Sequence, residues 1–218
     1  MNSARLKLVT PRAYEQRLRA EAAAATRDGI LEALFGRIRA EPSKPVSVDE
    51  IARLAGVARS TVYTVFGSRA GLFDALAQEL FDRGGFQRLL DAVHQPDPRA
   101  SLRGGITAGV EIFASDPDVF RALHSMEKLD ADAVGGAIAR IEERRAAGMA
   151  RLARRLKRAG ELRAGVSAAR AAHVLWIAAS FEAFDLLHSG RGLRPAQIAD
   201  ILVDGAERTI LDINQSIG

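Results

Sequence analysis

The sequence contains no cysteine among its 218 residues. This excludes disulfides, thiolate zinc sites and cysteine nucleophiles, and it fits the reducing cytoplasm. No apolar run approaches the roughly 18 residues that are needed to cross a bilayer. The first residues also lack the apolar core of a secretion signal. We therefore expect a soluble, cytoplasmic protein with no membrane partner.

The patterns of common enzymes and metal proteins are also missing. The four histidines show no metal-ligand spacing such as HExxH, and no glycine-rich phosphate loop or nucleophile elbow is present. We expect no catalytic residues, no metal and no cofactor. A helical enzyme is the remaining alternative; it would need titratable side chains that converge on a pocket, with His124 or His173 among them.

No segment alternates apolar and polar residues convincingly in the manner of a strand. The composition leans towards Ala, Leu and Arg, and its 48% hydrophobic and 27% charged residues are ordinary for a folded protein. The pattern predicts an all-α fold of about nine helices. Asp97 and Asp116 precede prolines and are expected to cap two of the later helices. These later helices are expected near 86–94, 98–114, 117–127, 131–160, 167–189 and 195–213.

Four regions are expected along the chain. Residues 1–13 would form a flexible arm, 14–67 a helix-turn-helix domain, 68–85 a connecting helix, and 86–218 a larger helical domain. The basic residues gather early: residues 1–72 hold 12 Lys and Arg against 7 Asp and Glu, whereas the remainder holds 19 against 20. A local basic excess suits contact with phosphate, although a solvated basic face would look the same.

The most informative stretch begins at Ser47 and reads SVDEIARLAGVARSTVYTVFGSRAGLFDAL. Ser47 and Glu50 match a capping box, and Gly56 stands where a helix ends in a left-handed turn. Two short helices joined by a tight turn containing Gly are typical of a helix-turn-helix, although an αα corner in a helical bundle has the same periodicity. The residues expected to face inward are Ile51, Leu54, Ala55, Val57, Val62 and Phe66.

A second set of residues in this stretch is left for the outer face. Hydroxyl groups, a phenol and a guanidinium are suitable partners for phosphates and base edges. In a helix-turn-helix, the second helix carries such residues into the major groove of DNA. The candidate contacts on this helix are Arg59, Ser60, Thr61, Tyr63 and Thr64.

The same stretch resembles the DNA-binding segment of the TetR family of transcriptional regulators. The shared pattern comprises Ser47, Ile51-Ala52, Ala55-Gly56-Val57, Thr61, Val62-Tyr63, Phe66, Ser68-Arg69 and Leu72-Phe73. The resemblance implies a three-helix DNA-binding domain, within residues 14–80, followed by a larger helical domain that binds an effector and forms a dimer. It further implies a regulator, most often a repressor, that leaves its operator when a small molecule binds.

The resemblance also implies roles for single residues. Ser47 and Arg69 would hold phosphates at the two flanks, with Arg69 where the family usually has Lys. Thr61 and Tyr63 would contact backbone or bases, and the variable positions Arg59, Ser60 and Thr64 would set sequence choice. This sequence departs from the family pattern at three positions, where a capping hydroxyl, a backbone-contacting His or Tyr and an acidic residue are replaced by Ala58, Val65 and Ala70.

The later part of the chain is less specific. Helices 131–160 and 167–189 could meet their twins in a four-helix interface of a homodimer, or could be buried within one subunit. A homodimer would place its recognition helices about 34–36 Å apart on a near-palindromic operator. A basic run between 140 and 158 is either a second nucleic-acid surface or, as is more usual, the solvated side of a helix.

An effector pocket of unknown specificity is expected among the middle helices. Apolar residues there would line it or simply form core, and two histidines would add polar contacts. The candidates are Phe113, Phe120, Leu123, His124, Met126, His173, Trp176 and Phe181. The sequence thus predicts a DNA-binding regulator that a small molecule releases from its operator. The alternative is a ligand-independent DNA-binding or architectural protein whose C-terminal domain only dimerises.

Overall fold

The computed structural model describes residues 11–129, 134 and 136–212, with the side chains of residues 11–13 left out. Within these residues the only regular elements are helices, beside one isolated bridge between Leu162 and Leu211. The all-α prediction is therefore confirmed, although the described part alone holds eleven helices. They are α1 (Pro11–Ala40), α2 (Val48–Leu54), α3 (Arg59–Phe66), α4 (Arg69–Gly84), α5 (Phe86–Val93), α6 (Pro98–Ser115), α7 (Pro117–Leu129), α8 (Ala137–Arg158), α9 (Ala168–Ala178), α10 (Phe181–Arg191) and α11 (Pro195–Ile210).

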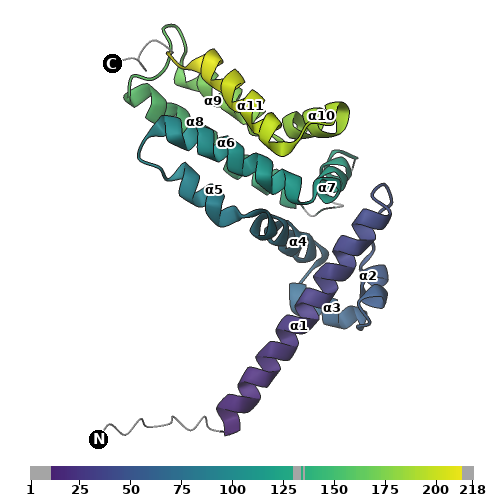
Figure 1. Cartoon of the computed structure of the whole chain (residues 1–218). Coiled ribbons are helices and arrows are strands. Elements are labelled where there is room, and N and C mark those ends of the chain that lie inside the picture. The colour runs from purple at the N-terminus through teal and green to yellow at the C-terminus, as the bar shows by residue number, and fades with distance from the viewer. Residues whose placement is uncertain (1–10, 130–133, 135, 213–218) are drawn as a thin grey trace, which may run out of the picture.

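Figure 1 shows two parts that share α4 as their connection. The long helix α1 runs diagonally, and α2 and α3 lie against its C-terminal half. Beyond α4, helices α5, α6, α8, α9 and α11 form a stack, while α7 and α10 lie at the end of that stack nearest α1. None of the helices described here is long and apolar enough to cross a membrane.

The core runs from the short helices into the larger stack. On α1, Ile30, Leu34 and Ile38 recur at helical spacing and are fully buried, as the sequence pattern predicts. They belong to one apolar cluster that continues through α2, α3 and α4 into α6, α7 and α10. Burying each such side chain contributes about 1.5–3 kcal/mol. The helix-turn-helix therefore rests on the same core as α7 and α10.

The structure corrects two expected boundaries. Helix α1 begins at Pro11, so residues 11–13 are helical and do not belong to an arm; the rest of the expected arm lies outside the described residues. The helix expected over 167–189 is two helices, because Ser180 adopts an extended backbone and its hydroxyl accepts a hydrogen bond from the Ala183 N–H. Ser180 thus caps α10 and interrupts an otherwise continuous apolar pattern.

The starts of the later helices follow the sequence signals more closely. The Asp97 carboxylate accepts hydrogen bonds from the N–H groups of Arg99 and Ala100, at 2.9 and 3.1 Å, and caps α6. Helix α7 begins at Pro117 as expected, and the Asp116 carboxylate receives the Arg39 guanidinium from α1. Helix α8 begins at Ala137, after Gly136 with its positive φ of 72°; the expected start at 131 lies outside the described residues.

Candidate nucleic-acid interface and ligand groove

The turn between α2 and α3 has the geometry of a helix-turn-helix. The Ser47 hydroxyl accepts a hydrogen bond from the Glu50 N–H at 3.2 Å and caps α2. Gly56 takes the left-handed φ of 67° that glycine adopts without strain, and the Val57 N–H then donates to the Ala52 carbonyl at 2.9 Å. Ile51 is fully buried in the same cluster as Val62 of α3, which holds α3 across α2.

Only half of the expected capping box forms, because the Glu50 side chain turns towards α1. The buried Arg37 donates from Nε to Glu50 Oε1 at 2.6 Å. Arg37 also donates to the carbonyl oxygens of Glu41 and Pro45, at 3.0 and 3.3 Å. This single guanidinium therefore ties the end of α1, the following turn and α2 together, and it fixes α2 on its support.

Leu54 was expected to face inward, and this prediction is wrong. Its side chain is 48% exposed at the C-terminal end of α2. The inward contacts of this seven-residue helix come from Ile51 and Ala52, and those of the turn from Ala55 and Val57. These residues already form the buried face of α2, and Leu54 lies outside that face.

Helix α3 presents the expected polar face. Ser60, Tyr63 and Thr64 are exposed together with Arg59, and Thr61 is half-buried. The Arg59 guanidinium lies over the Tyr63 ring, 5.6 Å from its centroid, and donates to the Tyr63 hydroxyl at 3.4 Å and to Asp49 Oδ2 at 3.0 Å. Arg59 and Tyr63 therefore form one unit, which α2 helps to orient through Asp49.

The two residues that the resemblance assigns to flanking phosphates lie close together. The half-buried Arg69, at the start of α4, donates from Nη2 to the carbonyl oxygen of Val46, the residue before Ser47, at 3.2 Å. Its guanidinium also lies over the Phe73 ring, at 5.1 Å.

At the start of α3, Ala58 provides no side-chain cap for the helix. The first N–H groups of α3 are thus left without a side-chain acceptor from this position.

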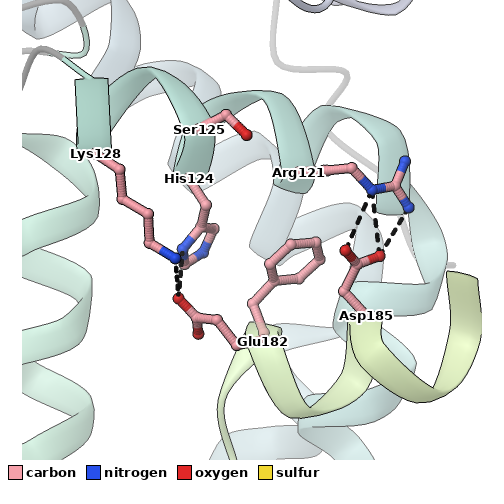
Figure 2. A pocket seen from close by; sticks show the side chains of 7 residues that line it. Arg121, His124, Ser125, Lys128, Glu182 and Asp185 are labelled. Carbon is pink, nitrogen blue, oxygen red and sulfur yellow. Dashed lines mark hydrogen bonds and ion pairs between the residues drawn. The ribbon is translucent and has the colours of Figure 1, made fainter. Parts of the chain in front are cut away.

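A second candidate site lies where α7, α8, α9 and α10 meet. A small hollow of about 110 Å³ opens between α7 and α10, as Figure 2 shows. A large hollow of about 430 Å³ is bounded by residues of all four helices. The two hollows share His124, Lys128 and Glu182, and together they are called the groove below.

Ion pairs between α7 and α10 border the small hollow. Lys128 Nζ lies 3.0 Å from Glu182 Oε1, and Arg121 Nη2 donates to Asp185 Oδ1 at 2.8 Å (Figure 2). Hydrogen bonding to Arg121 lowers the pKa of the Asp185 carboxyl. Burial of Glu182 opposes its ionisation, but its own backbone N–H and Lys128 outweigh burial and lower its pKa. Both carboxyl groups are therefore ionised at neutral pH.

His124 lines both hollows. Its ring stacks on the Phe181 ring at 4.8 Å, and its Nδ1 lies 3.8 Å from Glu182 Oε1. Burial lowers the pKa of this imidazole, and the nearby Glu182 only partly offsets that effect. His124 is therefore neutral at pH 7, and its distance from Glu182 does not represent a charged pair.

The large hollow has an aromatic wall. The Trp176 side chain is 42% exposed, and the Arg145 guanidinium lies 5.1 Å from its ring centroid. Arg145 is held there by Glu142, whose Oε1 accepts a hydrogen bond from Arg145 Nε at 3.1 Å. Three aliphatic side chains complete the apolar part of the lining: Ile138, Ala139 and Ile177.

The structure separates the expected pocket residues into three groups. His124, Trp176 and Phe181 line the groove. His173 is exposed and lies outside both hollows. The others are buried in the core, where the rings of two of them pack edge to face at 5.2 Å. These core residues are Phe113, Phe120, Leu123 and Met126.

Sequence reasoning missed the charged lining of the groove. Lys128, Glu142, Arg145 and Glu182 occupy positions on amphipathic helices that look like ordinary solvated positions. Lys128 and Glu182 are far apart in the sequence, and only the packing of α7 on α10 brings them together. No local pattern signals such a pair.

Comparison with known proteins agrees with this geometry. Residues 30–76 match the family model described as "Bacterial regulatory proteins, tetR family". A relative from Mycobacterium tuberculosis, the HTH-type transcriptional regulator AlkX, is 33% identical over 118 residues. That match covers 49% of this chain and 51% of the relative, so it spans about half of each protein.

Solved structures resemble almost the whole fold. NalD of Pseudomonas aeruginosa, described as the secondary repressor of the MexAB-OprM multidrug efflux pump, is 21% identical with a TM-score of 0.67, over 88% of this chain and 99% of its own. A TetR family transcription regulator from Marinobacter aquaeolei is 20% identical with a TM-score of 0.64, over 90% and 99%. At this identity the likeness concerns the fold alone.

Fold and site together define an all-helical protein with an N-terminal helix-turn-helix. The segment that is similar to the tetR family model, residues 30–76, runs from the middle of α1 into α4. The matched segment includes the whole of α2 and α3. The similarity to the family model therefore coincides with the helix-turn-helix that the structure forms.

Proposed function

We propose that this protein is a cytoplasmic transcriptional regulator, acting as a repressor, that binds operator DNA through α3 and the residues around it. The observation that carries the proposal is the outer face of α3, where Arg59, Ser60, Tyr63 and Thr64 are exposed on a helix held by a buried core. A recognition helix of this kind enters the major groove with polar side chains towards the bases. Ser47 and Arg69 would hold phosphates beside it.

The active form would be a homodimer. Helices α10 and α11 leave two large aliphatic side chains in solvent: Leu186 of α10 is 71% exposed and Ile201 of α11 is 49% exposed. A second copy that covers them would remove apolar surface from water and leave α3 of each subunit free for one half of a near-palindromic site. The proposed interface would use α10, which lies within the helix expected over 167–189 apart from its last residues, together with α11 in place of the expected helix 131–160.

A small molecule in the groove would release the DNA. Ligand binding changes DNA affinity only if the ligand prefers one of two arrangements of the protein. Helices α7 and α10 line both hollows of the groove, and both helices share a core with α1 and α2. A ligand that separates α7 from α10 would therefore also shift the support of α3.

A binding experiment with the DNA upstream of the protein's own gene tests this proposal. The purified protein should retard this DNA at low salt, and the affinity should fall steeply as salt is raised, because phosphate contacts release counterions. Failure to retard that DNA at any salt concentration, by a protein that melts cooperatively, would count against the proposed function.

A further inference from the structure

We propose that the large hollow between α7, α8, α9 and α10 binds an organic cation with an apolar body, such as a protonated aryl-alkyl amine. The expectation that this ligand releases DNA rests on the proposed function, whereas the binding site does not. The site itself is argued from the charges, the aromatic wall and the size of the hollow. Each can be followed in the residues that line it.

The charge balance of the large hollow favours a positive ligand. Its lining contains three carboxylates, those of Glu127, Glu142 and Glu182, against two permanent cations, Lys128 and Arg145. Lys128 is paired with Glu182 and Arg145 with Glu142. His124 adds no charge, because burial lowers the pKa of its imidazole.

Glu127 is the carboxylate left over from this pairing. It lines the hollow and is only partly exposed, and no ion pair joins it to a residue in the part of the chain that the structure describes. A partly buried carboxylate without a counter-charge attracts a cation more strongly than one in open water, because the effective dielectric constant is lower. The hollow therefore offers one uncompensated negative group to a ligand.

The aromatic wall already shows how this hollow accommodates a cation. The guanidinium of Arg145 lies 5.1 Å from the Trp176 ring centroid and is hydrogen-bonded to Glu142. An aromatic face with a carboxylate beside it is the arrangement that recognises organic cations. A ligand ammonium near Glu127 would find the rest of the exposed indole within the same hollow.

The size and the aliphatic lining suit the rest of such a ligand. The volume of about 430 Å³ falls within the usual range of small-molecule pockets, about 300–1,000 Å³. Ile138, Ala139 and Ile177 provide surface for a hydrocarbon body. A small inorganic cation would not contact this apolar surface. The lining therefore favours a cation that also has a hydrocarbon part.

Trp176 makes the test direct, because it is the only tryptophan of the chain and lies in the wall of the hollow. The full-length protein without DNA is titrated with three probes of similar shape: phenylbutylamine, phenylbutanol and phenylbutyrate. The amine is positive at pH 7, the alcohol neutral and the acid negative. Trp176 fluorescence should change with the amine at concentrations about tenfold below those that the other two require.

Two substitutions and one control variant identify the charged group that binds the amine. Glu127→Gln should weaken amine binding by about five- to tenfold. Glu143→Gln is the matched control: Glu143 is an exposed carboxylate of α8 that does not line the hollow, and its loss should change nothing. Lys128→Gln should leave amine binding equal or tighter, because it frees Glu182.

The remaining outcomes contradict the proposal. Tighter binding of phenylbutyrate, lost in Lys128→Gln, would make the hollow an anion site. Equal binding of all three probes would make it a purely apolar site, and no fluorescence change with any probe up to millimolar concentrations would show that it binds none of these compounds. In each case operator binding through α3 could still succeed, so failure here is distinct from failure of the proposed function.

Discussion

Arg39 of α1 and Asp116, which directly precedes α7, form an ion pair in which Arg39 Nε donates to Asp116 Oδ2 at 3.1 Å. Asp116 is largely buried at this contact, with its side chain 12% exposed. The pair joins the helix that supports the recognition helix to the helix that lines the groove. It is therefore a physical link between the two candidate sites.

Replacing Asp116 with Asn should loosen this link. We expect faster amide hydrogen exchange in the last turns of α1 and the first turn of α7, because the charged hydrogen bonds are lost. Global stability should change by only about 1 kcal/mol, since Arg39 is half exposed. Hydrogen exchange with mass spectrometry measures both regions.

Glu111→Gln is the control for this experiment. Glu111 pairs with Arg88 at 3.1 Å between α6 and α5, away from α1. Its substitution should leave exchange in α1 unchanged. If Asp116→Asn also leaves α1 unchanged, the ion pair does not hold the two helices together.

The charged contact between Arg37 and Glu50 should be the strongest single support of α2. Glu50→Gln leaves the buried guanidinium without its closest carboxylate and should lower the free energy of unfolding by about 1–3 kcal/mol. Asp49→Asn, the neighbouring change, removes only an exposed pair with Arg59 and should cost less than about 1 kcal/mol. Urea denaturation of both variants compares them; equal losses would contradict this assignment.

Substitutions on α3 should separate general affinity from sequence choice. Tyr63→Ala removes the ring that carries the Arg59 guanidinium, so binding to all duplexes should weaken and its salt dependence should flatten. Thr64→Ala should instead change which duplexes are preferred. Fluorescence anisotropy on a panel of duplexes at several salt concentrations distinguishes them, and identical effects of both changes on every duplex would contradict this division.

The buried imidazole of His124 should make stability depend on pH. Its pKa in the folded protein is lowered below the ordinary value of about 6.5, so the unfolded chain takes up a proton first as pH falls. Stability should therefore be full above pH 6.5 and decline below it, by up to about 1.4 kcal/mol per pH unit from this group. The charges of Glu182 and Glu142 raise the pKa of His124 and so oppose this effect. The charges of Lys128 and Arg145 lower that pKa and add to the effect.

His124→Gln should flatten that decline. His173→Gln, at an exposed position, should preserve it. Melting temperatures measured between pH 5 and pH 8 provide the comparison. A decline that survives in His124→Gln would have to come from another group.

The proposed dimer interface can be tested at its most exposed side chain. Leu186→Glu would place a charge where α10 meets a second copy, and we expect the dimer dissociation constant to rise by about a hundredfold or more. Leu129→Glu is the matched control, because Leu129 of α7 is also a solvent-exposed leucine, at 88%, but lies outside the proposed interface. Analytical ultracentrifugation should show a monomer only for the first variant.

Features that depend on neighbours in the sequence were predictable. The buried stripe of Ile30, Leu34 and Ile38 follows from helical periodicity, and the turn at Gly56 follows from the low cost of a left-handed glycine. The outer face of α3 consists of the polar residues that remain once the apolar residues are assigned to the buried face. Each of these needs only a few consecutive residues.

Features that depend on tertiary packing could not be predicted from the sequence. Glu50 has a local capping partner in sequence, yet Arg37 of another helix takes its carboxylate. Ser180 interrupts an apolar run that periodicity alone would continue. The groove arises because α7, α8, α9 and α10 place charged residues opposite one another, and their periodicity is that of a solvated face.

Selection of bound sequences from a random DNA pool is the most direct test of operator recognition through α3. It should be run with the purified protein and with Tyr63→Ala, each with and without phenylbutylamine. We expect a near-palindromic motif for the unmodified protein, with half-sites about one helical turn apart. No motif enriched under either condition, or the same enrichment with Tyr63→Ala, would contradict operator recognition through α3.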